Sequence, residues 1–320
     1  MKFTEVLKSR YPGVVLRGMA MGAADVVPGV SGGTIAFITG IYQELLESLS
    51  RIGPHCVTLL RKEGLLSAWH YINGNFLLSL FLGVLISVFS LAHLISGLLQ
   101  DFPIIVWSFF FGLVLASVVP IVRSIPQRSP FLLIFMVLGV ALAITVSELR
   151  PADMPATPLT LFLSGVLAIC AMALPGISGA FLLLLIGIYP KVLSAVHNLQ
   201  VTNLLCFAAG AAIGLMLFSR LLSWLMRKYM GGTLAFLAGV LVGSLKIIWP
   251  WKLPISGEID TVSKLAPLLS NTSPLSFAEK TGDSAHLGGA IAAAVAAILL
   301  VLAVDLFGGA RREKSCATPQ

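Results

Sequence analysis

A helix-breaking motif occurs twice in this chain, each time inside a long apolar segment. The sequence Pro-Gly-Val-Ser-Gly at 28–32 returns 147 residues later as Pro-Gly-Ile-Ser-Gly at 175–179, and the Gly-Ile-Tyr at 40–42 returns in the same register at 187–189. Proline removes a backbone donor and disfavours helical geometry at the preceding residue. In a membrane protein, interrupted apolar segments at matched positions of two halves point to a binding site where the halves meet.

The composition indicates that the surroundings of this chain are lipid. Apolar residues make up 57% of the sequence and charged residues only 11%, whereas a soluble domain carries about 25% charged residues. Long segments with almost no charge, as membrane spans require, lie at about 76–98, 104–122, 131–147, 203–226, 232–249 and 287–308. Two further apolar segments, about 14–49 and 160–196, contain the doubled motif. We therefore expect an all-α polytopic membrane protein.

The two halves of the chain have the same order of segments. We expect residues 1–150 and 151–320 to form two repeats, each a re-entrant helical hairpin followed by three transmembrane helices. Gly83 and Gly112 are 29 residues apart, as are Gly210 and Gly239, so the likeness extends beyond the motif. The alternative is a chance match between apolar, glycine-rich helices. If each hairpin returns to the side it entered from, each half crosses the membrane three times and the repeats are inverted.

The charges of the loops favour this topology. With the N-terminus inside, 15 Lys and Arg residues fall on the cytoplasmic side and six on the other, as the positive-inside rule requires. If the hairpins crossed the membrane fully, Arg51, Arg61 and Lys62 would move outside and weaken this bias. We therefore expect both termini to be cytoplasmic and the long loop at about 251–286 to be extracytoplasmic.

Four residues are expected to break the two hairpins. Pro28 and Pro175 end the incoming helices, and Gly29 and Gly176 permit the turns that follow.

The residues after each break are candidates for binding an anion. Ser31 and Ser178 are placed to cap a following half-helix, and Thr34 adds a hydroxyl near the first. Free N–H groups and partial positive charge at such a helix start suit phosphate. The alternative is that small residues here only permit close helix packing. The expected substrate-binding residues at the breaks are Ser31, Gly32, Gly33, Thr34, Ser178 and Gly179.

Charged residues inside apolar segments are costly and are functional candidates by default. Asp25 is a candidate for coupling to a proton or a cation, with Arg17 as its partner; the second half has Met172 in its place. The alternative for Asp25 is an ion pair near the interface. We count Arg220 among the substrate-binding candidates, since it either reaches a central phosphate or extends to the cytoplasmic face. His93 occupies the equivalent span position and is a second coupling candidate.

Glu44 and Lys191 follow the two Gly-Ile-Tyr sequences at equivalent positions. In the inverted arrangement they lie toward opposite surfaces, so they are interface residues or, with Arg17, parts of a gate.

Signatures of other function classes are missing from the sequence. No catalytic residues, metal ligands or cofactor site are expected, because the five histidines and four cysteines have no ligand or disulfide spacing and no nucleotide-binding loop is present. The basic residues lie in short loops, which argues against nucleic acid as a partner. Energy for uphill transport would therefore come from a proton or sodium gradient or from the flux of the substrate itself.

The stretches Gly22–Thr34 and Ala173–Ala180 together resemble the bacterial polyprenyl-phosphate translocase family of the PopT type, formerly a family of unknown function. The resemblance covers nearly the whole chain. It implies an inner-membrane carrier that returns undecaprenyl phosphate to the cytoplasmic leaflet for cell-envelope synthesis. Alternating access would expose the phosphate, held at the re-entrant helix starts, to each side in turn. The second copy departs from the first, because Ala180 and Phe181 stand where the first has glycine and threonine.

Three other functions stay open at this point. The first is a secondary transporter of a small soluble anion, and a less favoured one is a membrane enzyme acting on a lipid phosphate. The third is a scaffold or channel-like protein in which the two motifs only pack. The oligomeric state is also left open.

Overall fold

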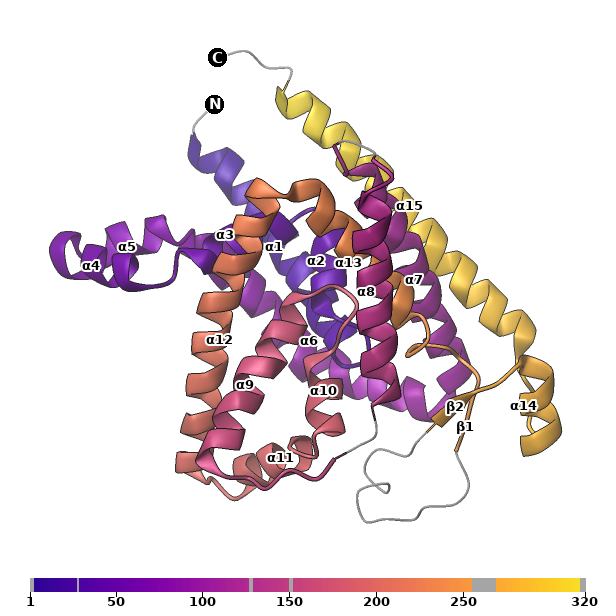
Figure 1. Cartoon of the computed structure of the whole chain (residues 1–320). Helices are drawn as coiled ribbons and strands as arrows, with labels where there is room; N and C mark the ends of the chain where they lie inside the picture. The colour runs from indigo at the N-terminus through magenta and orange to yellow at the C-terminus, as the bar shows by residue number, and fades with distance from the viewer. Residues whose placement is uncertain (1–2, 28, 127–128, 150–151, 255–268, 317–320) are drawn as a thin grey trace.

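The computed structural model describes residues 3–27, 29–126, 129–149, 152–254 and 269–316 of this chain (Figure 1). The first half of the described chain contains helices α1 (Phe3–Asp25), α2 (Gly32–Ile38), α3 (Tyr42–Ser50), α4 (Pro54–Glu63), α5 (Leu65–Tyr71), α6 (Gly74–Asp101), α7 (Pro103–Arg123) and α8 (Leu132–Glu148). The second half contains α9 (Pro158–Ala173), α10 (Gly179–Leu185), α11 (Tyr189–His197), α12 (Val201–Lys228), α13 (Met230–Ser244), β1 (Lys252–Pro254), β2 (Leu269–Asn271), α14 (Pro274–Thr281) and α15 (Leu287–Cys316).

Among the residues that the structure describes, four helices are long and apolar enough to cross a membrane: α6, α7, α12 and α15. They correspond to four of the six expected spans. The other two expected spans are the shorter apolar helices α8, of 17 residues, and α13, of 15 residues. The chain is thus a largely helical, multi-pass membrane protein.

The expected span at 232–249 is too long at its end. Helix α13 stops at Ser244, and the chain continues to Ile248 in tighter turns whose N–H groups reach back three or four residues. The Ser244 hydroxyl also bonds the Leu241 carbonyl, 2.8 Å away, and so competes for the last acceptors of the helix.

Helices α1 and α6 pack lengthwise in the first half, and α9 and α12 do so in the second. Glycines permit both approaches. A Cβ on Gly83 would lie 2.1 Å from the Val15 carbonyl oxygen, and a Cβ on Gly210 would lie 1.9 Å from the Phe162 carbonyl oxygen. Small residues let helix backbones approach closely in membranes, so the two halves use the same packing device.

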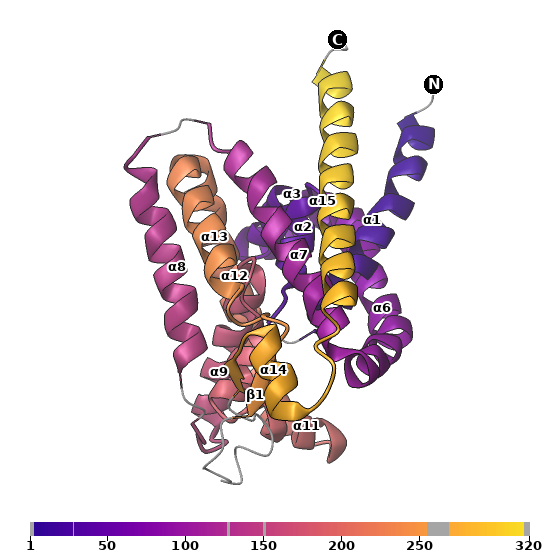
Figure 2. The ribbon, with the colours of Figure 1, turned by 90° about the vertical axis from the view of Figure 1, so that its right-hand side faces the viewer.

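The four remaining expected spans pair across the two halves. Helix α7 packs on α15, and α13 packs on α8, as Figure 2 shows. Gly112 faces Ala294 in the first pair, while Gly139 and Gly239 face the opposing backbone in the second.

The broken segments approach the middle of the bundle from opposite ends. Figure 1 shows α1 descending from the end that carries both termini and α9 rising from the end that carries α11 and α14. Helices α10 and α11 are bent by 103° relative to each other, so the chain turns away after the second break instead of continuing straight through.

The loop at about 251–286 contains a short two-stranded ribbon, which the expectation of an all-α protein did not include. Strands β1 and β2 pair there in antiparallel fashion, with Leu253 opposite Ser270. The chain must fold back on itself within this loop, and a two-stranded ribbon satisfies its backbone groups. Part of the loop, 255–268, lies outside the described residues.

Candidate functional site

The first break separates α1 from α2. Gly29 has φ +85°, a left-handed conformation that favours glycine. Ser31 is extended, and its side chain accepts a hydrogen bond of 3.1 Å from the Gly33 N–H, so it caps α2 as the sequence predicts. Pro28, one of the four expected hairpin-breaking residues, lies outside the described residues.

Asp25, the last residue of α1, reaches across this break. Its Oδ1 accepts a 2.6 Å hydrogen bond from the Gly32 N–H at the start of α2. Its other carboxylate oxygen lies where a side chain on residue 32 would begin, 2.6 Å from an ideal Cβ on Gly32. A carboxylate at a helix start is stabilised by the free donors and partial positive charge there. The anion position that the sequence suggested at this helix start therefore holds the chain's own carboxylate.

The second break, between α9 and α10, has the same backbone design. Gly176 has φ +89°, and Ser178 is extended and accepts a 3.4 Å hydrogen bond from the Phe181 N–H. Met172 occupies the place of Asp25: its Cγ lies 2.7 Å from an ideal Cβ on Gly179, just as Asp25 lies against Gly32. A thioether accepts hydrogen bonds only weakly, so this helix start has no charged partner from the equivalent position.

The two breaks touch each other. The Ser31 hydroxyl donates to the Met172 carbonyl oxygen at 3.2 Å, and the Gly176 N–H donates to the Thr34 hydroxyl oxygen at 3.1 Å. The Tyr42 hydroxyl donates to the Ala173 carbonyl oxygen at 2.8 Å. Ser31 and Thr34 are almost fully buried. The partners in these three contacts are 141, 142 and 131 positions apart in the sequence. Together the contacts form one junction between the two halves.

Tyr42 was not among the expected site residues. Its exposed fraction is 3%, whereas Tyr189 at the equivalent place is 39% exposed. The repeated Gly-Ile-Tyr marks both tyrosines in the sequence, but nothing in the sequence distinguishes the buried one.

Arg220 lies away from this junction. Its Nε donates to the Ser50 carbonyl oxygen and its Nη2 to that of Ile52, each at 3.1 Å. It therefore bonds carbonyl groups at the end of α3, where a cation is favourable. The structure does not bring it together with Ser31 or Ser178.

The other expected residues lie on the long helices and near the two ends of the bundle. His93 is exposed on α6, and Arg17 is half-buried on α1. Glu44 pairs with Arg10 and accepts a 2.8 Å hydrogen bond from the Asn73 side chain.

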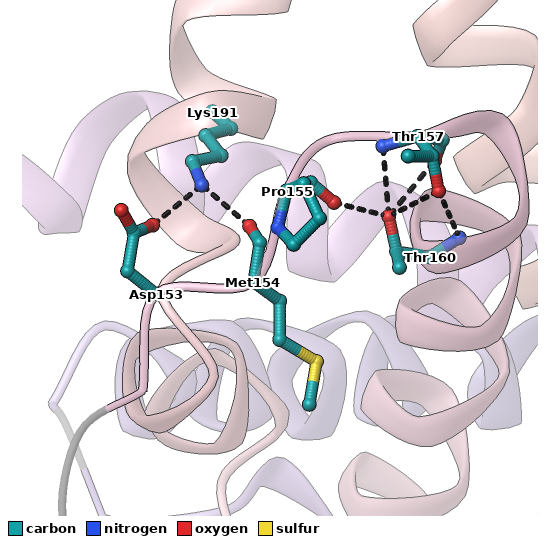
Figure 3. A network of polar contacts seen from close by, with 6 residues as sticks. All are labelled: Asp153, Met154, Pro155, Thr157, Thr160 and Lys191. Carbon is teal, nitrogen blue, oxygen red and sulfur yellow. Dashed lines mark hydrogen bonds and ion pairs between the residues drawn. The ribbon is translucent and has the colours of Figure 1, made fainter.

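Lys191 pairs with Asp153 and also donates to the Met154 carbonyl oxygen (Figure 3). Beside it, Thr157 and Thr160 form a capping box at the start of α9. Figure 3 shows how this network joins α11 to the chain segment that leads into α9.

No three His, Cys, Asp or Glu side chains are placed to share a metal ion among the residues that the structure describes.

Comparison with known proteins decides the family. A family described as undecaprenyl phosphate translocase-like matches residues 21–265 of this chain. The chain belongs to this family. The matched residues include both copies of the motif and all three contacts of the junction. The family resemblance that the doubled motif suggested is thereby confirmed.

Two relatives of this translocase-like chain are named polyprenyl-phosphate transporter. One, from Vibrio cholerae serotype O1, is 47% identical over 298 residues, covering 93% of this chain and 97% of the relative. The other, from Staphylococcus aureus, is 31% identical over 254 residues, covering 74% of this chain and 85% of the relative. No solved structure matches this chain.

Proposed function

We propose that this chain carries undecaprenyl phosphate across the bacterial inner membrane and returns it to the cytoplasmic leaflet for cell-envelope synthesis. The observation that carries this proposal is the near full-length similarity to the Vibrio cholerae protein named polyprenyl-phosphate transporter. The junction adds a physical reason, because it places broken backbone and hydroxyl groups of both halves inside an apolar bundle. Such backbone is tolerated at membrane depth only where protein or a wet cavity satisfies it.

The two halves are proposed to be inverted repeats, residues 1–150 and 151–320. The pairing of α1 with α6 matches that of α9 with α12, and the pairing of α7 with α15 matches that of α13 with α8. Helices α1 and α9 also approach the junction from opposite ends (Figure 1). The two termini leave the bundle at the same end, which would be the cytoplasmic side by the positive-inside rule.

The phosphate is proposed to bind at the junction, at the starts of α2 and α10. Gly32, Gly33 and Gly179 offer backbone N–H groups, and Ser31, Thr34 and Ser178 offer hydroxyls. In the structure, the Asp25 carboxylate bonds the Gly32 N–H. The phosphate would replace this carboxylate, and a proton or sodium ion taken up by Asp25 would make the exchange electrically favourable. His93 and Arg220 would act only if the helices that carry them move toward the junction.

The two ion pairs are proposed to act as gates at the two ends of this path. Glu44 pairs with Arg10 near one end of the bundle, and Lys191 pairs with Asp153 near the other. Opening one pair while the other stays closed would expose the junction to one side at a time. Arg17, on the helix that leads from Arg10 to the junction, would lie along the cytoplasmic path.

The test is leaflet-specific access to undecaprenyl phosphate in vesicles that contain the purified protein. The wild-type protein should make lipid from the outer leaflet accessible inside, and Ser31→Ala should slow this strongly because it removes the cap of α2 and the contact with Met172. The control is Ser273→Ala, which removes an equivalent cap from α14, away from the junction.

Three outcomes would contradict the proposal. Wild-type protein that moves no lipid phosphate, or moves a soluble phosphate equally well, would favour the soluble-anion alternative. Release of inorganic phosphate during the assay would favour the enzyme alternative. Equal transport by the Ser31→Ala and Ser273→Ala variants would move the binding site away from the junction.

A further inference from the structure

The first half carries an excursion that the second half lacks. Helices α4 and α5 lie between α3 and α6, whereas only three residues separate α11 from α12. Figure 1 shows α4 and α5 projecting sideways from the bundle, nearer the end with the two termini than the end with α11 and α14. The projecting element needs an explanation, because nothing in the bundle covers its outer side.

The excursion is a built structure and not a loose loop. Arg51 donates to the Tyr71 carbonyl oxygen at 3.2 Å, and the His55 ring lies edge-on to the Tyr71 ring. The Trp69 indole donates to the Asn75 side chain at 2.8 Å. These contacts close the base of the excursion, and Arg220 on α12 bonds the two carbonyl groups just before α4. The element is therefore held in a fixed position beside the bundle.

Its outer surface combines apolar and basic side chains. Val57 and Leu60 are three residues apart on one side of α4, and they are 47% and 44% exposed. Leu65 and Leu66 begin α5 at the far end of the excursion and are 72% and 69% exposed. Such exposure in water would cost free energy without a compensating contact.

The basic residues lie on the polar side of α4 and at its edge. At about 100° per residue, Lys62 falls with Thr58 about 100–160° away from Val57 and Leu60, and Arg61, four residues after Val57, lies at the edge between the two sides. Glu63 is the only acidic residue between Arg51 and Asn75, so the element is positively charged. An amphipathic helix with basic residues on its polar side lies in the interfacial plane of a membrane, with its apolar side among the acyl chains.

We propose that α4 and α5 form an anchor that lies in the headgroup layer of the cytoplasmic leaflet and binds anionic phospholipid. Leu60, Leu65 and Leu66 enter the acyl-chain boundary, and Arg61 and Lys62 contact the anionic headgroups. Each basic side chain near such a surface contributes to the attraction, which falls off within a Debye length. The inference concerns lipid that surrounds the protein, so it does not depend on which molecule is transported.

The test measures what surrounds residue 66 in the intact protein. The four natural cysteines, Cys56, Cys170, Cys206 and Cys316, are replaced, and a single cysteine is introduced as Leu66→Cys or, as the matched control, Thr58→Cys. Each is labelled with a small fluorophore after purification and placed in phosphatidylcholine vesicles. Quenching is compared for acrylamide in water and for phosphatidylcholine or phosphatidylglycerol that carries a nitroxide near the headgroup.

The label at position 66 should be quenched by the lipid nitroxides and protected from acrylamide, with the reverse at position 58. Quenching at 66 should be stronger with the phosphatidylglycerol nitroxide than with the phosphatidylcholine one at equal mole fraction. Adding Arg61→Gln and Lys62→Gln should abolish that preference, while Lys280→Gln on α14 should leave it. Melting curves of the labelled variants exclude those that do not fold.

Two results would overturn the proposal. Equal acrylamide quenching at 66 and 58 would place the excursion in water. Protection of position 66 from both acrylamide and lipid nitroxides, with energy transfer between labelled copies, would show that a second copy of the chain covers it.

Discussion

The two breaks have nearly the same backbone and different side chains. Gly29 and Gly176 have φ +85° and +89°, and the later turn glycines Gly40 and Gly187 have φ +72° and +71°. Each break ends in a serine cap. The two breaks therefore share the path of the backbone, whereas the side chains that this backbone carries differ.

The divergence is concentrated at three positions. The first half has a carboxylate, a hydroxyl and a buried phenol at Asp25, Thr34 and Tyr42. The second half has a thioether, an aromatic ring and an exposed phenol at the equivalent places. The first half therefore supplies the side chains of the junction, and the second supplies mainly backbone: the Met172 and Ala173 carbonyls and the Gly176 N–H.

The largest expected effect is a loss of stability when the packing glycines that the two halves share are replaced. Gly83→Ala and Gly210→Ala each place a Cβ within about 2 Å of an opposing carbonyl oxygen, at 2.1 and 1.9 Å. Each should destabilise the protein by about 3 kcal/mol or more, because the helices must separate. Thermal unfolding in detergent, followed by loss of the monodisperse peak, measures this. Gly97→Ala on α6 is the control, since nothing lies near its Cβ position; a marked difference between the two halves would contradict the likeness.

The next largest effect is expected on transport, at the equivalent positions 25 and 172, where the two halves have different side chains. Asp25→Asn keeps an acceptor for the Gly32 N–H but removes the charge, whereas Met172→Leu changes neither charge nor polarity. Asn cannot take up the proton or cation of the proposed exchange, so transport by Asp25→Asn should fall about tenfold or more, which corresponds to about 1.4 kcal/mol or more. Transport by Met172→Leu should stay near that of the wild type. Equal rates for the two variants in the vesicle assay would remove the assigned asymmetry.

The equivalent residues Tyr42 and Tyr189 are expected to contribute differently to the free energy of unfolding. Tyr42→Phe leaves the Ala173 carbonyl without its partner and should lower the free energy of unfolding by about 1–2 kcal/mol. Tyr189→Phe should change it by less than about 0.5 kcal/mol, because this residue is exposed. Paired melting measurements check this, and an equal loss for both tyrosines would mean that the Tyr42 contact contributes little.

Small stability effects are expected at the two ion pairs that are proposed as gates. Glu44 and Lys191 occupy equivalent positions with opposite charge, and each has a partly exposed partner, Arg10 or Asp153. Glu44→Gln and Lys191→Gln should each cost less than about 1 kcal/mol. If the pairs are gates, each variant should still alter the rate of transport. Unchanged rates in both directions of lipid gradient would remove the gate role.

The sequence was sufficient for the features that depend on local chemistry. The doubled motif predicted both breaks and both serine caps, because proline, glycine and serine act on the backbone beside them. The paired glycines of the spans led to the prediction of two repeats, and the inverted arrangement of these repeats stays a prediction.

The contacts between distant segments were not predictable in this way. Asp25 was expected as a coupling group, but its bond to Gly32 depends on how far α1 turns at the break. The burial of Tyr42 depends on α9 arriving beside it. Arg220 was expected near a phosphate and instead bonds the end of α3, since the approach of α12 to α3 is set by packing across the bundle.

One packing contact uses its glycine on different helices in the two halves, so a comparison of single positions does not reveal it. Gly22 faces Ser87 in the first half, and Ile169 faces Gly214 in the second; each glycine leaves 2.9 Å between its Cβ position and the opposing side chain. The glycine lies on α1 in the first pair of helices and on α12 in the second, and the close approach of the two helices is the same. Aligned residue by residue, the two halves differ here, although the packing is equivalent.

The central claim is that the phosphate group crosses at the junction and engages the first half more than the second. The most direct test uses a single cysteine, introduced as Ser31→Cys, Ser178→Cys or, as a control, Ser273→Cys in a chain without natural cysteines. The rate of modification by a small thiol reagent is measured with undecaprenyl phosphate and with undecaprenol, which has the same tail and no phosphate. The account predicts that undecaprenyl phosphate slows modification most at position 31, less at 178 and not at 273, while undecaprenol slows none. Equal rates at position 31 with the two lipids would contradict it.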